Sequence, residues 1–172
     1  MAHARENTML IYIIRHAWAV DSGDPAWPDD FQRPLTDEGK KRFAKMAKFL
    51  QKRGFAPEIV ATSPLVRCRQ TAEIIARGVD GSPKLVELEA LRPGSDFREI
   101  LDWTRREARN AREVAWVGHA PDVSHLAGSL LGAPESAIHF AKGAVAAIAF
   151  EDLPEAGRGE LQWLVTAKVL GE

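Results

Sequence analysis

The feature that most constrains this fold is an apolar run that ends abruptly in an arginine and a histidine. Residues 9–14 (Met-Leu-Ile-Tyr-Ile-Ile) favour extended backbone and predict a buried strand. A strand that is apolar on both faces is typical of a sheet covered by helices on both sides. Ligands of such sheets bind beyond the carboxyl ends of the strands, where Arg15 and His16 stand. This stretch alone indicates either a binding site or a polar strand boundary.

The length and charge of the chain narrow its class. Its 172 residues predict one domain over residues 1–172, with residues 1–8 as a flexible lead-in. A formal net charge of −1 argues against a sequence-independent nucleic-acid binder. The single cysteine, Cys68, agrees with a reducing compartment. Because we find neither a membrane-length apolar segment nor a secretory signal, we expect a cytoplasmic protein with no membrane partner.

Predicted strands and helices alternate along most of the chain. This order predicts a three-layer α/β/α fold with a mostly parallel central sheet. Two final strands separated by a turn rich in proline, glycine and acidic residues predict a closing C-terminal hairpin. The expected strands are 9–14, 58–62, 84–88, 114–117, 143–150 and 161–168, and the expected helices are 37–53, 65–77, 95–110 and 122–131.

Hydroxyl side chains stand where three of these helices are expected to begin. Thr36, Ser63 and Ser95 are each predicted to be an N-cap, since a side-chain oxygen can accept a free amide of the first turn. The irregular segment 15–34 before the first helix is longer than most connections in compact domains. Long loops of this kind are often functional.

Three of the predicted strands are followed by charged or titratable residues. The first leads into Arg15 and His16, the second reaches Arg67 through Ser63, and the fourth ends at His119. Because parallel strands share one carboxyl edge, we expect these side chains to converge in one cleft. Arginine binds phosphate oxygens with a planar fork of donors, and helix N-termini add backbone N–H groups. The sequence therefore predicts a phosphate pocket that contains a nucleophilic imidazole.

These residues carry a resemblance to a known family. The chain resembles the histidine phosphatase superfamily, which has a phosphoglycerate mutase-like fold, and most of all its small phosphohistidine phosphatases of the SixA type. The matching segments are Arg15-His16-Ala17, Arg33-Pro34-Leu35-Thr36, Ser63-Pro64 with Arg67 and Gln70-Thr71, and Gly118-His119. Ala17 departs from the family's usual Arg-His-Gly, and we expect it to narrow the pocket slightly.

The resemblance implies a mechanism. His16 would attack phosphorus and form a phosphohistidine intermediate, while Arg15, Arg67 and His119 bind the phosphate oxygens. Water would then release inorganic phosphate, without a cofactor or a metal ion. Related phosphomonoesterases use a carboxylate after the third strand as proton donor; Glu87 and Glu89 lie about there, and Glu89 is the candidate. The alternative is that no dedicated acid is needed, because a protonated imidazole is easier to expel than an alkoxide. Asp21 and Asp24 in the first long loop are weaker candidates for this acid.

The lengths of the loops bear on the substrate. No segment is long enough to form a large cap, so we expect an open pocket that suits phosphohistidine in a protein. A phosphatase of small phosphomonoesters is one alternative, and a non-catalytic phosphate-binding module is another. Cys68 is expected to be a buried helix residue, because the Cys-x5-Arg loop of cysteine phosphatases is missing. His125 and His139 are expected to lie outside the site.

Overall fold

The computed structural model describes residues 8–171. The lead-in expected over residues 1–8 therefore lies outside the described residues except for Thr8. The strands are β1 (Met9–Arg15), β2 (Ile59–Thr62), β3 (Lys84–Glu87), β4 (Glu113–Gly118), β5 (Val145–Phe150) and β6 (Glu160–Val165). The helices are α1 (Asp37–Gln51), α2 (Val66–Gly78), α3 (Phe97–Glu107) and α4 (Asp122–Leu130), with 3-10 turns η1 (Asp30–Gln32), η2 (Glu89–Leu91) and η3 (Ala167–Leu170).

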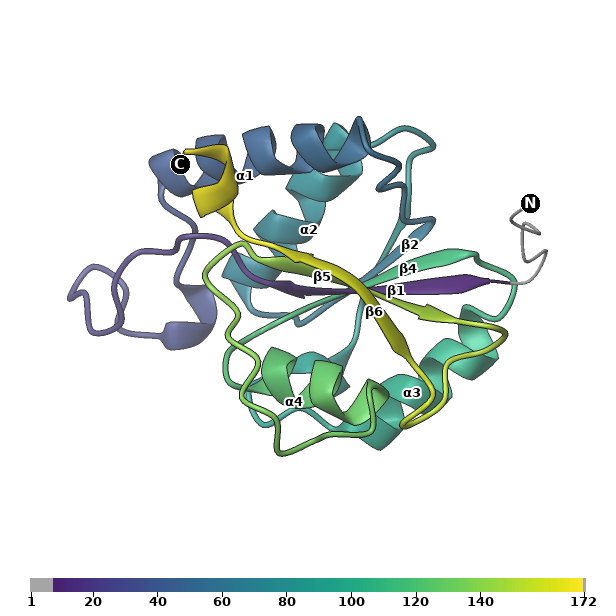
Figure 1. Cartoon of the computed structure of the whole chain (residues 1–172). Coiled ribbons are helices and arrows are strands. Elements are labelled where there is room, and N and C mark those ends of the chain that lie inside the picture. Colours follow the sequence, from purple (N-terminus) through teal and green to yellow (C-terminus); the bar gives the residue numbers. More distant parts are fainter. Residues whose placement is uncertain (1–7, 172) are drawn as a thin grey trace.

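The six strands form one mixed sheet with the order β3-β2-β4-β1-β5-β6. The strands β1 to β4 pair in parallel, whereas β5 is antiparallel to β1 and β6 is antiparallel to β5. Helices α1 and α2 cover one face of the sheet, and α3 and α4 cover the other (Figure 1). The predicted three-layer α/β/α fold with a closing hairpin is confirmed.

The two faces of β1 bury different side chains. Ile11 and Ile13 belong to the apolar cluster under α3 and α4, while Tyr12 and Ile14 belong to the cluster under α1 and α2. All four are almost fully buried. Alternate residues of a strand point to opposite faces, so a helix layer on each face requires an uninterrupted apolar run. This requirement explains why the first strand lacks polar residues.

Two of the three predicted helix caps are wrong. Thr36 caps α1 as expected, but α2 begins after Leu65, and Asp96 caps α3 in place of Ser95. The hydroxyl of Ser63 lies 2.9 Å from the Nε2 atom of His119 instead. A residue with cap chemistry is thus used to contact a neighbouring strand end. The predicted last strand is also shorter, because residues 167–170 form η3.

The loop that follows β1 is held against the start of α1. The Thr36 amide donates to the Trp18 carbonyl oxygen at 2.9 Å, and the Thr36 hydroxyl accepts from the Gly39 amide at 2.9 Å. A Cβ atom on Gly39 would collide with the Trp18 carbonyl oxygen and lie 2.8 Å from the Trp18 Cβ. The absence of a side chain at Gly39 therefore permits the close contact that holds Trp18, near the start of the loop, against the first turn of α1.

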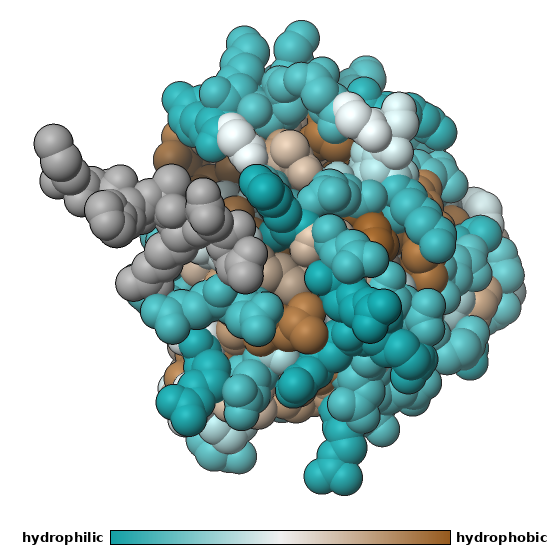
Figure 2. All heavy atoms as spheres, turned by 90° about the vertical axis from the view of Figure 1, so that its right-hand side faces the viewer, coloured by the Kyte–Doolittle hydropathy of each residue, from teal (hydrophilic) through white to brown (hydrophobic). Residues whose placement is uncertain are grey.

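Hydrophilic side chains cover most of the side of the molecule that is remote from this loop (Figure 2). Hydrophobic side chains appear there only in small, scattered patches (Figure 2). Within residues 8–171, no helix has the length and apolar character needed to cross a membrane.

Substitution of Gly39 tests this packing. Helix propensity alone would make Gly39→Ala stabilising by about 1 kcal/mol. We expect the opposite sign, a net loss of about 1–3 kcal/mol, because the new methyl group overlaps backbone that must shift. Urea unfolding measures the change. Ala44→Gly, at an exposed position of the same helix, is the control for propensity, and a stabilising Gly39→Ala would contradict the close contact.

Candidate active site

Backbone pairing brings three strand ends to one place. Arg15 pairs in register with Gly118, and the next amide, that of His16, donates to the Gly118 carbonyl oxygen at 3.0 Å. The Ser63 amide donates to the Val117 carbonyl oxygen at 3.0 Å on the other side of β4. The residues that follow β1, β2 and β4 are therefore adjacent at the carboxyl edge of the sheet.

A cavity of about 420 Å³ lies at this edge, and all four predicted phosphate-site residues line it. These are Arg15, His16, Arg67 and His119. Arg33 and Lys142 add positive charge, and Asp21 and Asp30 add negative charge to the same walls. The cations outnumber the carboxylates among these residues, so the cavity favours an anion.

His16 is held as a neutral imidazole. Its Nδ1 atom lies 2.7 Å from the carbonyl oxygen of Ala17, so Nδ1 carries the proton and donates it. The Nε2 atom is left with its lone pair. Burial lowers the pKa of His16 from 6.5 to about 3, with a smaller contribution in the same direction from Arg67 and Arg15, although the hydrogen bond to Ala17 opposes this shift. An uncharged ring with a free Nε2 lone pair can attack phosphorus.

Ala17 does not narrow the cavity as expected. Its side chain is fully buried in the apolar cluster under α1 and α2, and it is not among the residues that line the cavity. Its amide donates to the Thr71 hydroxyl at 3.1 Å. The extra methyl group therefore packs in the core, while the Ala17 carbonyl remains available to orient His16.

Arg15, which is partly buried, and Arg67, which is buried, each have a buried N–H group without a partner within the described residues. Arg15 donates from Nη1 to the Phe140 carbonyl oxygen at 2.8 Å, and Arg67 donates from Nη1 and Nη2 to Asp30. The Nε atoms of both arginines are buried and unpaired within the described residues. Buried donors are almost always hydrogen-bonded in native proteins. Both arginines also line the cavity, and phosphate oxygens are suitable acceptors for arginine N–H groups.

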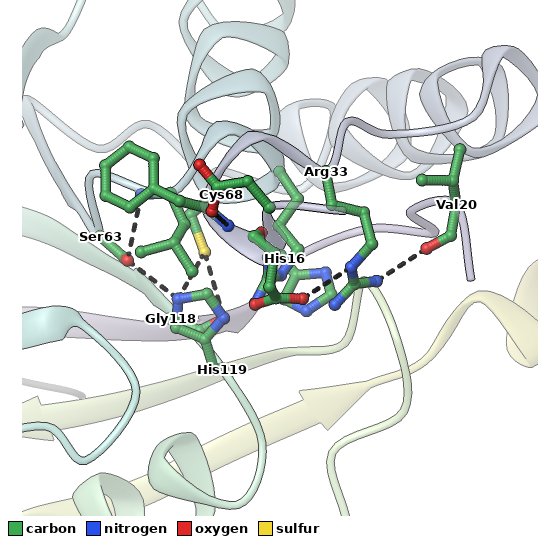
Figure 3. A network of polar contacts seen from close by, with 12 residues as sticks. His16, Val20, Arg33, Ser63, Cys68, Gly118 and His119 are labelled. Carbon is green, nitrogen blue, oxygen red and sulfur yellow. Dashed lines mark hydrogen bonds and ion pairs between the residues drawn. The ribbon is translucent and has the colours of Figure 1, made fainter. Parts of the chain in front are cut away.

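His119 faces His16, and their ring centroids are 5.4 Å apart. Its Nε2 atom lies 2.9 Å from the Ser63 hydroxyl and 3.4 Å from the Cys68 sulfur (Figure 3). Burial, followed by the charge of Arg67, lowers the pKa of His119 to about 4. Cys68 is fully buried, as predicted, and burial raises the pKa of its thiol to about 12.

The structure does not bring Glu89 to the cavity. Its side chain is 71% exposed and pairs with Arg92 at 2.9 Å, and it does not line the cavity. Asp24 and His139 also lie outside the cavity lining, whereas Asp21 belongs to it. The weaker acid candidate therefore lies nearer to the predicted site than the stronger one.

Asp30 and Lys142 line the cavity but were missed by the sequence analysis, and Asp30 makes the more extensive contacts of the two. One carboxylate oxygen accepts from the Arg33 Nε atom at 2.8 Å, and the other accepts from the Arg67 Nη2 atom at 2.9 Å. The backbone oxygen of Asp30 accepts from Nη1 of Arg67 at 2.8 Å. The one available signal in the sequence was that Asp30 stands three residues before Arg33, which opens the family segment Arg33-Pro34-Leu35-Thr36. The loop has no periodic pattern, however, so the sequence does not reveal which of its residues face the cavity.

Comparison with known proteins agrees with this geometry. Residues 11–166 match the histidine phosphatase superfamily, branch 1. The chain belongs to this superfamily. It is 39% identical to an uncharacterized protein of Picosynechococcus sp. over 120 residues. This aligned region covers 69% of this chain and 71% of that protein.

Solved structures of the superfamily share the fold over nearly the whole chain. The protein histidine phosphatase SixA complexed with tungstate has a TM-score of 0.80 and 26% identity, covering 94% of this chain and 99% of that one. A putative phosphohistidine phosphatase SixA from Nakamurella multipartitia has a TM-score of 0.76 and 26% identity, covering 93% and 96%. These likenesses, together with the family match, support a hydrolase with phosphatase activity.

The state of His16 can be observed directly. We expect the folded protein to keep a neutral, Nδ1-protonated His16 from pH 7.5 to pH 5, because its pKa is lowered to about 3. In the urea-unfolded chain the same ring should gain its proton near pH 6.5. Long-range proton–nitrogen NMR of labelled protein distinguishes both the charge and the tautomer. A folded His16 that titrates near pH 6.5, or that carries its proton on Nε2, would contradict the geometry.

Substitution of Arg67 tests the anion site. Arg67→Lys keeps the charge but loses the unpaired Nε donor and the planar fork. We expect the affinity for inorganic phosphate to fall by roughly tenfold or more, since hydrogen bonds to charged groups contribute about 1.5–3 kcal/mol. Isothermal titration calorimetry measures this affinity.

Arg69→Lys is the matched control for Arg67→Lys. Arg69 lies on the same helix, is half-exposed and contacts Glu87 at 3.4 Å outside the cavity. We expect Arg69→Lys to bind phosphate as the parent protein does. Equal losses in the two variants would argue against a phosphate contact by Arg67.

Proposed function

We propose that this protein is a phosphatase that forms a phosphohistidine intermediate on His16 and dephosphorylates phosphohistidine in proteins. The observation that carries the proposal is that one cavity contains both hydrogen-bond donors for phosphate oxygens and a nucleophile for phosphorus. Two arginines, each with an unpaired N–H group, line the same cavity as a neutral imidazole with a free Nε2 atom. A phosphoryl group would satisfy the arginines and accept the lone pair of His16.

In the first step, the Nε2 atom of His16 forms a bond to phosphorus as the bond from phosphorus to the leaving group breaks. Arg15 and Arg67 bind the non-bridging oxygens and offset their charge in the transition state. His119, whose ring centroid lies 5.4 Å from that of His16, would donate a further hydrogen bond to these oxygens from Nδ1, the ring nitrogen that does not contact Ser63. The carbonyl of Ala17 stabilises the positive charge that develops on the His16 ring.

In the second step, water attacks the phosphorus atom of phosphorylated His16. The electron pair of the broken bond returns to Nε2, while the proton on Nδ1 stays hydrogen-bonded to Ala17. His16 is thereby restored in its starting tautomer. The proton released by water stays on the inorganic phosphate that leaves the cavity.

Two observations favour phosphohistidine as the substrate. The segment between β3 and α3 holds only η2 and a short turn, so no cap closes the cavity at that side. Two solved SixA proteins named as histidine or phosphohistidine phosphatases are 26% identical to this chain. By contrast, a mycobacterial glucosyl-3-phosphoglycerate phosphatase is 15% identical and shares the fold alone. A cytoplasmic phosphoprotein substrate is compatible with the single, reduced cysteine.

A non-catalytic phosphate-binding module is the second candidate. The same arginines would hold a phosphorylated partner in that case. Binding alone, however, gains nothing from a buried imidazole whose Nε2 atom is kept neutral and unpaired, since a protonated ring would bind phosphate better. The state of His16 therefore favours turnover.

Trapping of the intermediate tests the proposed function. After rapid denaturing quench with a phosphorus-32-labelled phosphohistidine protein, we expect acid-labile, alkali-stable label on His16. His16→Ala should carry no label and lose at least about 10³-fold in turnover, as expected when a nucleophile is removed. His125→Ala, outside the cavity, is the control. Phosphate binding without label or turnover would favour the binding module, and faster hydrolysis of sugar phosphates would favour a phosphomonoesterase.

A further inference from the structure

Two carboxylates lie at the exposed part of the cavity, although most of the charged side chains that line it are cationic. His16, at 7% exposure, lies deep, while the Asp30 side chain is 53% exposed. Asp21 lines the same cavity from the same loop. In-line displacement sends the leaving group away from His16, which is toward the exposed part of the cavity. A leaving group would thus depart past carboxylates and not past an acid that lies deeper in the site.

Asp30 is ionised and retains capacity to accept hydrogen bonds. Although partial burial opposes ionisation, the hydrogen bond from Arg33 and the charge of Arg67 hold the pKa of Asp30 below its usual range. Each carboxylate oxygen accepts one arginine N–H in the structure. Ionised carboxyl groups offer about four acceptor positions, so a ligand N–H can still be accommodated. Asp30 is therefore suited to accept a proton-bearing group and unsuited to donate a proton.

The chemistry of the proposed leaving group fits such an acceptor. A phosphohistidine ring whose second nitrogen carries a proton is cationic. When the bond from nitrogen to phosphorus breaks, the electron pair stays on that nitrogen and the ring leaves as neutral imidazole. No proton donor is needed, provided that the second nitrogen is protonated beforehand. A carboxylate hydrogen-bonded to that N–H favours the protonated ring.

We infer that Asp30 accepts the N–H of the substrate's phosphohistidine ring and thereby favours a protonated ring, which leaves as neutral imidazole, over a group that leaves as an alkoxide. This inference rests on the proposed function and names the residue that determines its specificity. Asp30 would accept a hydrogen bond from the N–H of the substrate ring, as the Ala17 carbonyl accepts one from Nδ1 of His16. The phosphoryl group would then pass between two imidazole rings, each with its N–H group hydrogen-bonded to an oxygen. Anionic leaving groups, such as those of sugar phosphates, would be repelled by the same carboxylate.

The variant Asp30→Asn tests this inference through a ratio of rates. The amide oxygen can still accept from Arg67, but the negative charge is lost. We expect kcat/KM for a phosphohistidine peptide to fall roughly tenfold more than kcat/KM for p-nitrophenyl phosphate, as expected for loss of a charge-assisted hydrogen bond. Asp29→Asn changes the same charge at the adjacent residue, whose side chain accepts from the Phe31 amide outside the cavity. This control should leave the ratio unchanged.

A purely structural role for Asp30 gives a different result. If Asp30 only holds Arg67 in place, Asp30→Asn should lower both rates by the same factor, and the inference is then overturned. The pH profile adds a second readout, since loss of the carboxylate should move the alkaline limb of kcat for the peptide to lower pH. An unmoved limb would also overturn the inference. Wild-type protein that hydrolyses the monoester but no phosphohistidine peptide would instead refute the proposed substrate.

Discussion

The parallel pairing of β1 with β4 is the constraint on which the site depends. The hydrogen bond from the His16 amide to the Gly118 carbonyl extends the strand register by one residue, and this places His16 opposite His119. A shift of one residue would turn every side chain of β1 to the other face. The two apolar clusters prevent such a shift, because each requires its own alternate residues of β1. Core packing on both faces of the sheet therefore also sets the geometry of the chemistry.

The site concentrates positive charge where water is largely excluded, and the fold offsets this in two ways. Both histidines remain neutral, since burial disfavours their charged forms more strongly than any other influence. Asp30 neutralises part of the charge of Arg67 and Arg33 and ties η1 to α2. Cationic side chains still outnumber carboxylates on the walls of the cavity, which favours an anion.

Residues on regular elements could be predicted from the sequence, and residues placed by loops could not. Arg15, His16 and His119 follow buried strands, whose shared edge follows from the alternation of strands and helices. Arg67 follows from its place in the first turn of a helix. Asp30 is positioned by a loop that has no periodicity, and the hydroxyl of Ser63 is used by His119 across strands instead of by its own helix. Contacts between segments distant in the sequence decide such cases.

The burial of Cys68 has a consequence for how the protein responds to oxidants. Its sulfur packs against the ring of His119, but the thiol is fully buried and its pKa is raised to about 12. Thiols react with peroxide and alkylating reagents as thiolates, so this one is protected both by its protonation and by its inaccessibility. Phosphatases that depend on a cysteine nucleophile stop working when that sulfur is oxidised. If His16 is the nucleophile as proposed, the reaction depends on ring nitrogens and not on a thiolate, so its chemistry would not be lost by oxidation of an exposed sulfur.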